Sequence, residues 1–262
     1  PELHASPVSH FPPASLLFDA HPLGASTGYR PLITNVRIAD LDADGRPDVL
    51  VCDGRRNRVF WYHNMPDGKW EETPIGDEMA CPVGTAVVDL DKDGDLDVVV
   101  AVLGDIWPTD ARVGRVVWLE NKGGGNFVTH TILEHIRRVS DVQAADLDGD
   151  GDIDLAVAEY GYDRGCVLWL ENKGSGAFAD HLLLATQGPS HVPLADYDGD
   201  GDIDIAALVS QEHEEVWAFE NDGNGHFTPR ILHAFTNFDL GSAGLIATDV
   251  NGDGKPELVL SA

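Results

Sequence analysis

Basic residues are scarce in this sequence. It contains 17 Lys and Arg against 45 Asp and Glu among 262 residues, a formal net charge of −28. Nucleic acids and anionic membrane surfaces are bound through basic side chains, so we expect neither as a partner. Long apolar runs are also missing: no stretch approaches the roughly 18 residues that a membrane-spanning helix needs, so we expect no membrane insertion. Hydrophobic residues still make up 43% of the chain, enough for a folded core.

Cysteines and local catalytic motifs are scarce too. The three cysteines, Cys52, Cys81 and Cys166, cannot all pair within one chain and show no C-x-x-C spacing. We expect small buried side chains, and leave open a Cys52–Cys81 disulfide in an oxidising compartment. The sequence contains no phosphate loop or H-E-x-x-H motif. This absence does not exclude a lyase, whose bases need no local motif.

The acidic residues are concentrated in a repeat. The pattern D-x-[DN]-x-D-G-x-x-[DE] occurs five times, and its copies start 49, 57, 50 and 53 residues apart. A period near 50 residues is typical of one four-stranded propeller blade rather than of a helical repeat. The copies are DLDADGRPD (40–48), DLDKDGDLD (89–97), DLDGDGDID (146–154), DYDGDGDID (196–204) and DVNGDGKPE (249–257).

This loop has the chemistry of a calcium site. Carboxylates at positions 1, 3, 5 and 9 converge if the chain bends at the Gly of position 6, and position 7 offers its backbone carbonyl. An EF-hand is rejected because position 12 is never Glu and both flanks read as strands. We therefore predict up to five structural Ca²⁺ ions. The predicted ligands are Asp40, Asp42, Asp44, Arg46 and Asp48; Asp89, Asp91, Asp93, Asp95 and Asp97; Asp146, Asp148, Asp150, Asp152 and Asp154; Asp196, Asp198, Asp200, Asp202 and Asp204; and Asp249, Asn251, Asp253, Lys255 and Glu257.

The segments between the acidic loops read as strands. RVFWYHN (58–64), RVVWLEN (115–121), CVLWLEN (166–172) and EVWAFEN (215–221) are expected third strands with central Trp residues, and Gly-rich turns follow each of them. The sequence thus predicts an all-β propeller of four-stranded blades. We expect an N-terminal segment (1–29) with a closing or preceding-blade strand, then repeats over 30–262. The expected blades are about 30–78, 79–134, 135–186, 187–235 and 236–262, the last partial, so the ring is expected to be incomplete in this chain.

The acidic loops and the WLEN-turn-Phe segments resemble the FG-GAP/VCBS repeat family over residues 30 to 262. The resemblance implies integrin-α-like blades around an axis, Ca²⁺ in hairpins on the lower face, and placement outside the cell, closest to the secreted bacterial type. Similar propellers occur in some polysaccharide lyases and in a fungal sugar dehydratase. Asn251 and Glu257 depart from the pattern and are expected to weaken the fifth site.

Candidate ligand residues lie in the loops expected on the opposite face. The loop 103–114 and its neighbour 159–165 carry aromatic and arginine side chains. Side chains of these types can bind a sugar or a charged peptide. The alternative is that these loops only pack against each other through Arg–Asp pairs. The candidates are Trp107, Arg112, Tyr160, Tyr162 and Arg164.

A catalytic alternative comes from the first strands. Asp141 and His191 occupy one repeat position on successive blades, with Arg137 and Arg138 nearby, and could act as acid and base or hold a metal. The alternative is a solvated channel mouth.

The sequence favours a calcium-stabilised module that binds a protein or a polysaccharide, secreted, periplasmic or on the cell surface, because extracellular calcium keeps even modest sites filled. The other hypotheses are a carbohydrate-active enzyme of lyase or dehydratase type, or its propeller domain, and a structural subunit of a larger assembly.

Overall fold

The computed structural model describes residues 23, 28, 30–211, 214–235 and 244–261. The strand expected in the N-terminal segment lies outside these residues. Within them every regular element is a β-strand, and no helix long and apolar enough to cross a membrane occurs. The all-β prediction is confirmed.

The strands form four blade-like sheets and one hairpin, all antiparallel. The first sheet contains β1 (Ile33–Ala39), β2 (Asp48–Asp53), β3 (Arg58–Asn64) and β4 (Trp70–Ile75). The second contains β5 (Pro82–Val88), β6 (Asp97–Val102), β7 (Gly114–Asn121) and β8 (Phe127–Ile136). The third contains β9 (Arg138–Ala145), β10 (Asp154–Tyr160), β11 (Gly165–Asn172) and β12 (Phe178–Thr186). The fourth contains β13 (Pro189–His191), β14 (Leu194–Ala195), β15 (Asp204–Ser210), β16 (Glu214–Asn221) and β17 (Phe227–Ala234), and the hairpin contains β18 (Gly244–Thr248) and β19 (Glu257–Ser261).

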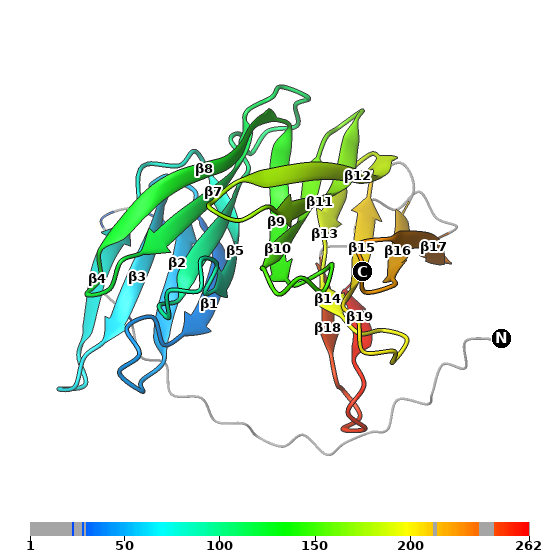
Figure 1. Ribbon diagram of the computed structural model, residues 1–262. Helices are drawn as coiled ribbons and strands as arrows, with labels where there is room; N and C mark the ends of the chain where they lie inside the picture. Colours follow the sequence, from blue (N-terminus) through cyan, green and yellow to red (C-terminus); the bar gives the residue numbers. More distant parts are fainter. Residues whose placement is uncertain (1–22, 24–27, 29, 212–213, 236–243, 262) are drawn as a thin grey trace, which may run out of the picture.

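The sheets follow one another around an open arc (Figure 1). The first strands β1, β5, β9, β13 and β18 contact one another in that order. In the part of the chain that the structure describes, no hydrogen-bonded ladder joins β18 or β19 to the sheet of β1. The predicted propeller with an incomplete ring is therefore confirmed. The acidic loops join first and second strands, so they lie at one end of each blade, and the loops 103–114 and 159–165 lie at the other (Figure 1).

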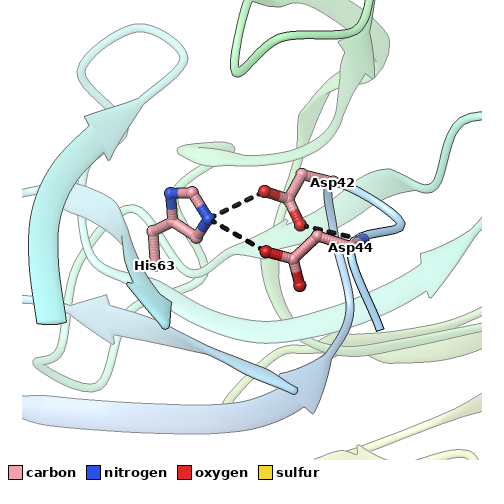
Figure 2. A group of neighbouring side chains, drawn as sticks. All are labelled: Asp42, Asp44 and His63. Carbon is pink, nitrogen blue, oxygen red and sulfur yellow. Dashed lines mark hydrogen bonds and ion pairs between the residues drawn. The ribbon is translucent and has the colours of Figure 1, made fainter. Parts of the chain in front are cut away.

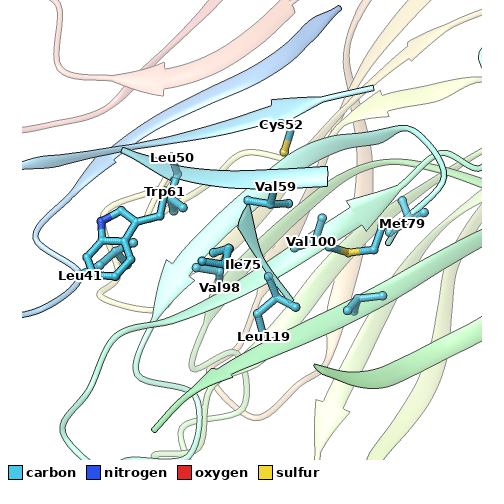
Figure 3. Packing of buried hydrophobic residues seen from close by; sticks show 12 residues of the cluster. Leu41, Leu50, Cys52, Val59, Trp61, Ile75, Met79, Val98, Val100 and Leu119 are labelled. Carbon is cyan, nitrogen blue, oxygen red and sulfur yellow. The ribbon is translucent and has the colours of Figure 1, made fainter. Parts of the chain in front are cut away.

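The core lies between neighbouring blades. In the four complete sheets, second strands are buried on both faces, as in β6, where Val98, Val99 and Val100 are all 0% exposed. This burial explains why second strands are continuous apolar runs rather than alternating ones. In Figure 3, Leu50 and Val59 of the first blade pack in one cluster with Val98 and Leu119 of the second. Each blade thus completes the core of its neighbour, as repeat architectures require.

A tryptophan and a glycine join successive blades. Trp61, Trp118 and Trp169 of the third strands are each 6% exposed. A glycine in the β-turn of the following blade lies against each ring, at Gly125, Gly176 and Gly225. A Cβ built on Gly225 would lie 2.4 Å from Trp169, and this glycine has a φ of +74°, so both space and backbone conformation require glycine there. The recurring tryptophans and Gly-rich turns therefore contact each other between successive blades.

In the fourth blade an alanine stands in the place of this tryptophan. Ala218 occupies the register position of the earlier tryptophans, opposite Ala206, while Trp217 pairs with Ala207. Phe219 is fully buried and fills the cluster beside Trp169.

The three cysteines are free. Cys52 and Cys81 are buried in the first two blades, and Cys166 is half-buried, with its thiol donating to Glu159 at 2.9 Å. The disulfide left open by the sequence is not formed in this structure.

Candidate metal loops and the opposite ligand face

Backbone hydrogen bonds fix the shape of each acidic loop. In the second loop, Asp89 at position 1 accepts a bond from the N–H of Gly94, 3.1 Å away. Asp97 at position 9 is fully buried and accepts from Leu90 at 3.1 Å and from Asn121 at 2.7 Å. The first, third and fourth loops repeat all three bonds. Position 9 therefore ties the loop to the end of the third strand, a role that spacing alone does not reveal.

Three carboxylates converge in four of the five loops. Positions 1, 3 and 9 of each bring oxygen atoms within 4.8 Å of one another. The clusters are Asp40, Asp42 and Asp48; Asp89, Asp91 and Asp97; Asp146, Asp148 and Asp154; and Asp196, Asp198 and Asp204. Position 5 lies outside these triads, and its carboxylate accepts the N–H of position 7, as Asp93 does from Asp95 at 3.0 Å.

The electrostatics of these clusters fit a divalent cation. Burial raises the pKa of the Asp97 and Asp154 carboxyls to about 6, although backbone N–H groups donate to both. Oδ1 of Asp89 is buried and has no hydrogen-bond partner among the described residues. Packing carboxylates this closely is costly without a compensating positive charge. The donor set is made of hard oxygen atoms, the type that Ca²⁺ takes.

The fifth loop is different. It keeps the backbone bonds, with Asp249 accepting from Gly254 and Glu257 accepting from Val250, each at 2.8 Å. The Asn251 amide, however, donates to Glu257 at 2.6 Å and to Asp253 at 3.1 Å. A neutral donor thus satisfies the carboxylates of positions 5 and 9, and position 9 is one of the three that converge in the other loops.

The first loop has a histidine that sequence reasoning missed. His63 Nε2 lies 2.7 Å from Asp42 and 3.8 Å from Asp44 (Figure 2). The residue before the strand-ending Asn is His only here, and is Glu120 in the second blade and Glu171 in the third. Comparing the residue at this repeat position among the blades would have identified His63 as a residue that contacts the loop.

The loops also connect neighbouring blades. The Asn121 amide donates to the carbonyl of Leu41 in the preceding blade at 3.1 Å, and Asn221 donates to Leu147 in the same way at 2.7 Å. Lys92 of the second loop reaches Asp152 of the third at 2.5 Å. A change in the conformation of one of these acidic loops therefore affects its contacts with the neighbouring blade.

At the opposite end of the strands is a pocket of about 400 Å³. It is formed where β9 and β13 begin and β10 and β15 end, and its lining includes Ile106, Tyr160, Tyr162, His191 and Gln211. The structure thus brings the predicted Tyr160 and Tyr162 together with His191.

The other ligand candidates lie around this pocket without lining it. Trp107 is 74% exposed, and its carbonyl accepts a bond from Arg138 at 3.2 Å. Arg112 and Arg164 are exposed on the same two loops. The loops contact each other through the N–H of Asp163, which donates to Asp110 at 3.1 Å. This contact is a backbone-to-carboxylate bond rather than an expected Arg–Asp pair, and it leaves the aromatic side chains exposed.

Asp141 and His191 are engaged separately. Asp141 is buried and accepts bonds from the backbone of Val192 at 2.9 Å and from the Gln143 amide at 3.0 Å. His191 Nδ1 lies 3.2 Å from the Ser190 hydroxyl. Among the described residues no hydrogen bond joins Asp141 to His191, and Asp141 serves as a link between the third and fourth blades.

Comparison with known proteins agrees with this repeat structure. A model described as FG-GAP-like repeat matches residues 40–100, 101–157, 146–207 and 196–260. The chain belongs to the FG-GAP-like repeat family. No curated protein matches the chain.

Solved propeller structures share the fold. An Agrocybe aegerita lectin, described by its specific recognition of non-reducing terminal N-acetylglucosamine, superposes with a TM-score of 0.56 at 18% identity, covering 86% of this chain and 60% of the lectin. The Dos1 propeller superposes with a TM-score of 0.52 at 11% identity, covering 83% of this chain and 50% of that one. This FG-GAP chain therefore spans 60% or less of either relative.

Proposed function

We propose that this FG-GAP chain is a calcium-stabilised, extracytoplasmic propeller module that binds a glycan in the pocket opposite the acidic loops. The observation that carries the proposal is the combination of a pocket of about 400 Å³ with exposed aromatic side chains at its edge. Tyr162 is 53% exposed and Trp107 is 74% exposed. Aromatic planes stack on the apolar faces of sugar rings, and nearby polar groups hydrogen-bond sugar hydroxyls.

The polar groups needed for a sugar are present in the same lining. Ser140, Ser190 and Gln211 supply hydroxyl and amide groups, and Tyr160 is hydrogen-bonded by the Gln211 amide. Both serine hydroxyls already contact backbone carbonyls of neighbouring strands, as Ser140 does with Pro189 at 3.0 Å. Their positions are therefore set by the surrounding strands, which favours a preorganised site.

Calcium would act on the scaffold rather than on the ligand. The carboxylates of positions 1, 3 and 9 would hold the ion, and its charge would offset their mutual repulsion. Five ions would add ten positive charges to a net charge of −28, leaving −18. Because the first three loops are bonded to the next blade, the ion would stabilise the interface as well as the turn. Extracellular calcium would keep such sites filled, which supports a location outside the cytoplasm.

The test is retention of the calcium-loaded protein on immobilised neutral and acidic oligosaccharides, with product formation followed in the same samples. We expect retention without product. Tyr162→Ala and Trp107→Ala should each weaken binding about tenfold, because each removes one stacking surface. Leu182→Ala is the matched control, since Leu182 is 63% exposed on β12 and lies outside the pocket lining. Unchanged binding in both aromatic variants would contradict the placement, and product would support an enzyme instead.

A further inference from the structure

The pocket differs in charge from the rest of the molecule. None of its 11 lining residues is Asp or Glu, although the chain carries 45 acidic residues. The lining instead contains Arg138 and His191. In a protein with a net charge of −28, a pocket without a lining carboxylate repels an anionic group less than a pocket lined by carboxylates would.

Arg138 is a buried cation with unused hydrogen-bond donors. The residue is 4% exposed, and its guanidinium lies 4.8 Å from the centre of the Tyr160 ring. Nη1 donates to the carbonyl of Trp107. Nε and Nη2 are buried and have no hydrogen-bond partner in the described part of the chain. Unpaired buried donors of a charged group are unfavourable, so their presence beside a pocket points to an acceptor that a ligand brings.

The neighbouring arginine provides a comparison. Arg137 forms an ion pair with Glu159 at 3.0 Å, and Glu159 also accepts the backbone N–H of Arg137 at 2.9 Å. Arg138 forms no ion pair among the described residues. Nε of the half-buried Arg137 also has no hydrogen-bond partner among the described residues. The two arginines differ in their charge partner: a protein carboxylate neutralises Arg137, whereas no described carboxylate pairs with Arg138.

The free edge of Arg138 has the geometry of a carboxylate receptor. The N–H bonds of Nε and Nη2 run parallel on one side of a guanidinium, which matches the two oxygens of a carboxylate. Protein atoms cover both nitrogens here, so a small movement of the covering side chains accompanies binding. Asp105, Asp110 and Asp163 lie on the surrounding loops, but Asp105 and Asp163 are exposed and solvent screens them more strongly than a buried charge.

We propose that the pocket binds an acidic sugar, a uronate-type residue whose carboxylate pairs with Arg138 while its ring stacks on Tyr160 or Tyr162. This inference rests on the proposed glycan binding and specifies its ligand class. The buried guanidinium supplies the charge, the tyrosines supply the apolar contact, and the absence of a lining carboxylate discriminates in favour of the anion. A neutral sugar of the same shape leaves the Nε and Nη2 donors unpaired.

The test compares each acidic oligosaccharide with its own methyl ester. Oligomers of galacturonate, glucuronate and mannuronate, and their esters, are titrated calorimetrically into the calcium-loaded protein. We expect at least one acid to bind about tenfold or more tightly than its ester, because the ester keeps the skeleton and removes the charge. Arg138→Gln should reduce the acid's affinity to that of the ester, and Arg138→Lys should retain part of the difference.

The control is Arg230→Gln, which removes an exposed arginine on β17 that pairs with Glu220 outside the pocket. Equal binding of acid and ester in the wild-type protein overturns the acidic-sugar assignment and leaves glycan binding standing. If no uronate binds and a neutral oligosaccharide does, the assignment fails in the same way. If nothing binds, the proposed function fails with it. Should Arg138→Gln not fold, the comparison of acid with ester in the wild-type protein decides.

Discussion

The glycine turns that contact tryptophans allow a graded test of the blade interface. Gly225→Ala places a Cβ 2.4 Å from Cη2 of Trp169 and 3.0 Å from Cζ3. The ring has little room to move, because it stacks on His181 with centroids 4.4 Å apart and meets Phe227 edge-on at 5.5 Å. Alanine at a φ of +74° costs about 1–2 kcal/mol, and overpacking a filled site costs about 1–3 kcal/mol more. We expect Gly225→Ala to destabilise the protein by about 2–5 kcal/mol.

Gly174→Ala is the matched control for the cost of placing alanine at a positive φ. Gly174 has a φ of +75° in the equivalent turn of the third blade, and nothing lies within 4 Å of an added Cβ. Gly176→Ala is a second control, at a turn that does contact a tryptophan, since its Cβ would lie at an ordinary 3.5 Å from Trp118. In urea unfolding at fixed calcium, Gly174→Ala and Gly176→Ala should lose similar amounts, about 1–2 kcal/mol. Equal losses in Gly225→Ala and Gly174→Ala would refute the interblade contact.

Three further predictions concern the loops and the thiols. Burial raises the pKa of Asp97 and Asp154 to about 6 from an ordinary 3.8, so folding without calcium disfavours the charged carboxylates. Stability of the chelator-treated protein should therefore rise as pH falls from 7 toward 4, and a lower melting temperature at pH 5 than at pH 7.5 would contradict this. In calcium titrations, Asp97→Asn should weaken binding at the second loop, because it removes a carboxylate. Asn251→Asp should strengthen binding at the fifth loop, because it replaces an amide with a carboxylate. Unchanged isotherms in both variants would exclude these loops as calcium sites. Burial raises the pKa of the Cys52 thiol to about 12, so thiol reagents at pH 8 should modify it only after unfolding, and rapid labelling of the native protein would disprove its burial.

Most of the fold is predictable from the sequence because it is repeated. Five acidic loops in one register, with tryptophan strands and Gly-rich turns between them, predict the blades and their order. The register also indicates where the pattern breaks: Trp217 is displaced by one position, and Ala218 stands opposite Ala206 where the earlier blades have a tryptophan. Repetition averages out local ambiguity, since each repeat is independent evidence for the same element.

The interactions between blades were less predictable. Asn121 bonds Leu41 across 80 residues, and spacing within one repeat contains no information about that contact. The pocket was predicted only in part, because Tyr160 and Tyr162 stood out as aromatic residues in a loop. The sequence places Arg138 near the expected channel mouth and does not predict it as a ligand residue. Its importance comes from burial and from the missing partner of its Nε and Nη2, which only the structure reveals.

Hydrogen exchange tests most directly whether the glycan binds at the face opposite the acidic loops. The calcium-loaded protein would be compared with and without the oligosaccharide that binds most tightly in the retention screen. We expect slower amide exchange in the loops 103–114 and 159–165, with exchange in the acidic loops unchanged. Protection confined to the acidic loops 40–48, 89–97, 146–154 and 196–204, with the opposite loops unaffected, would contradict it.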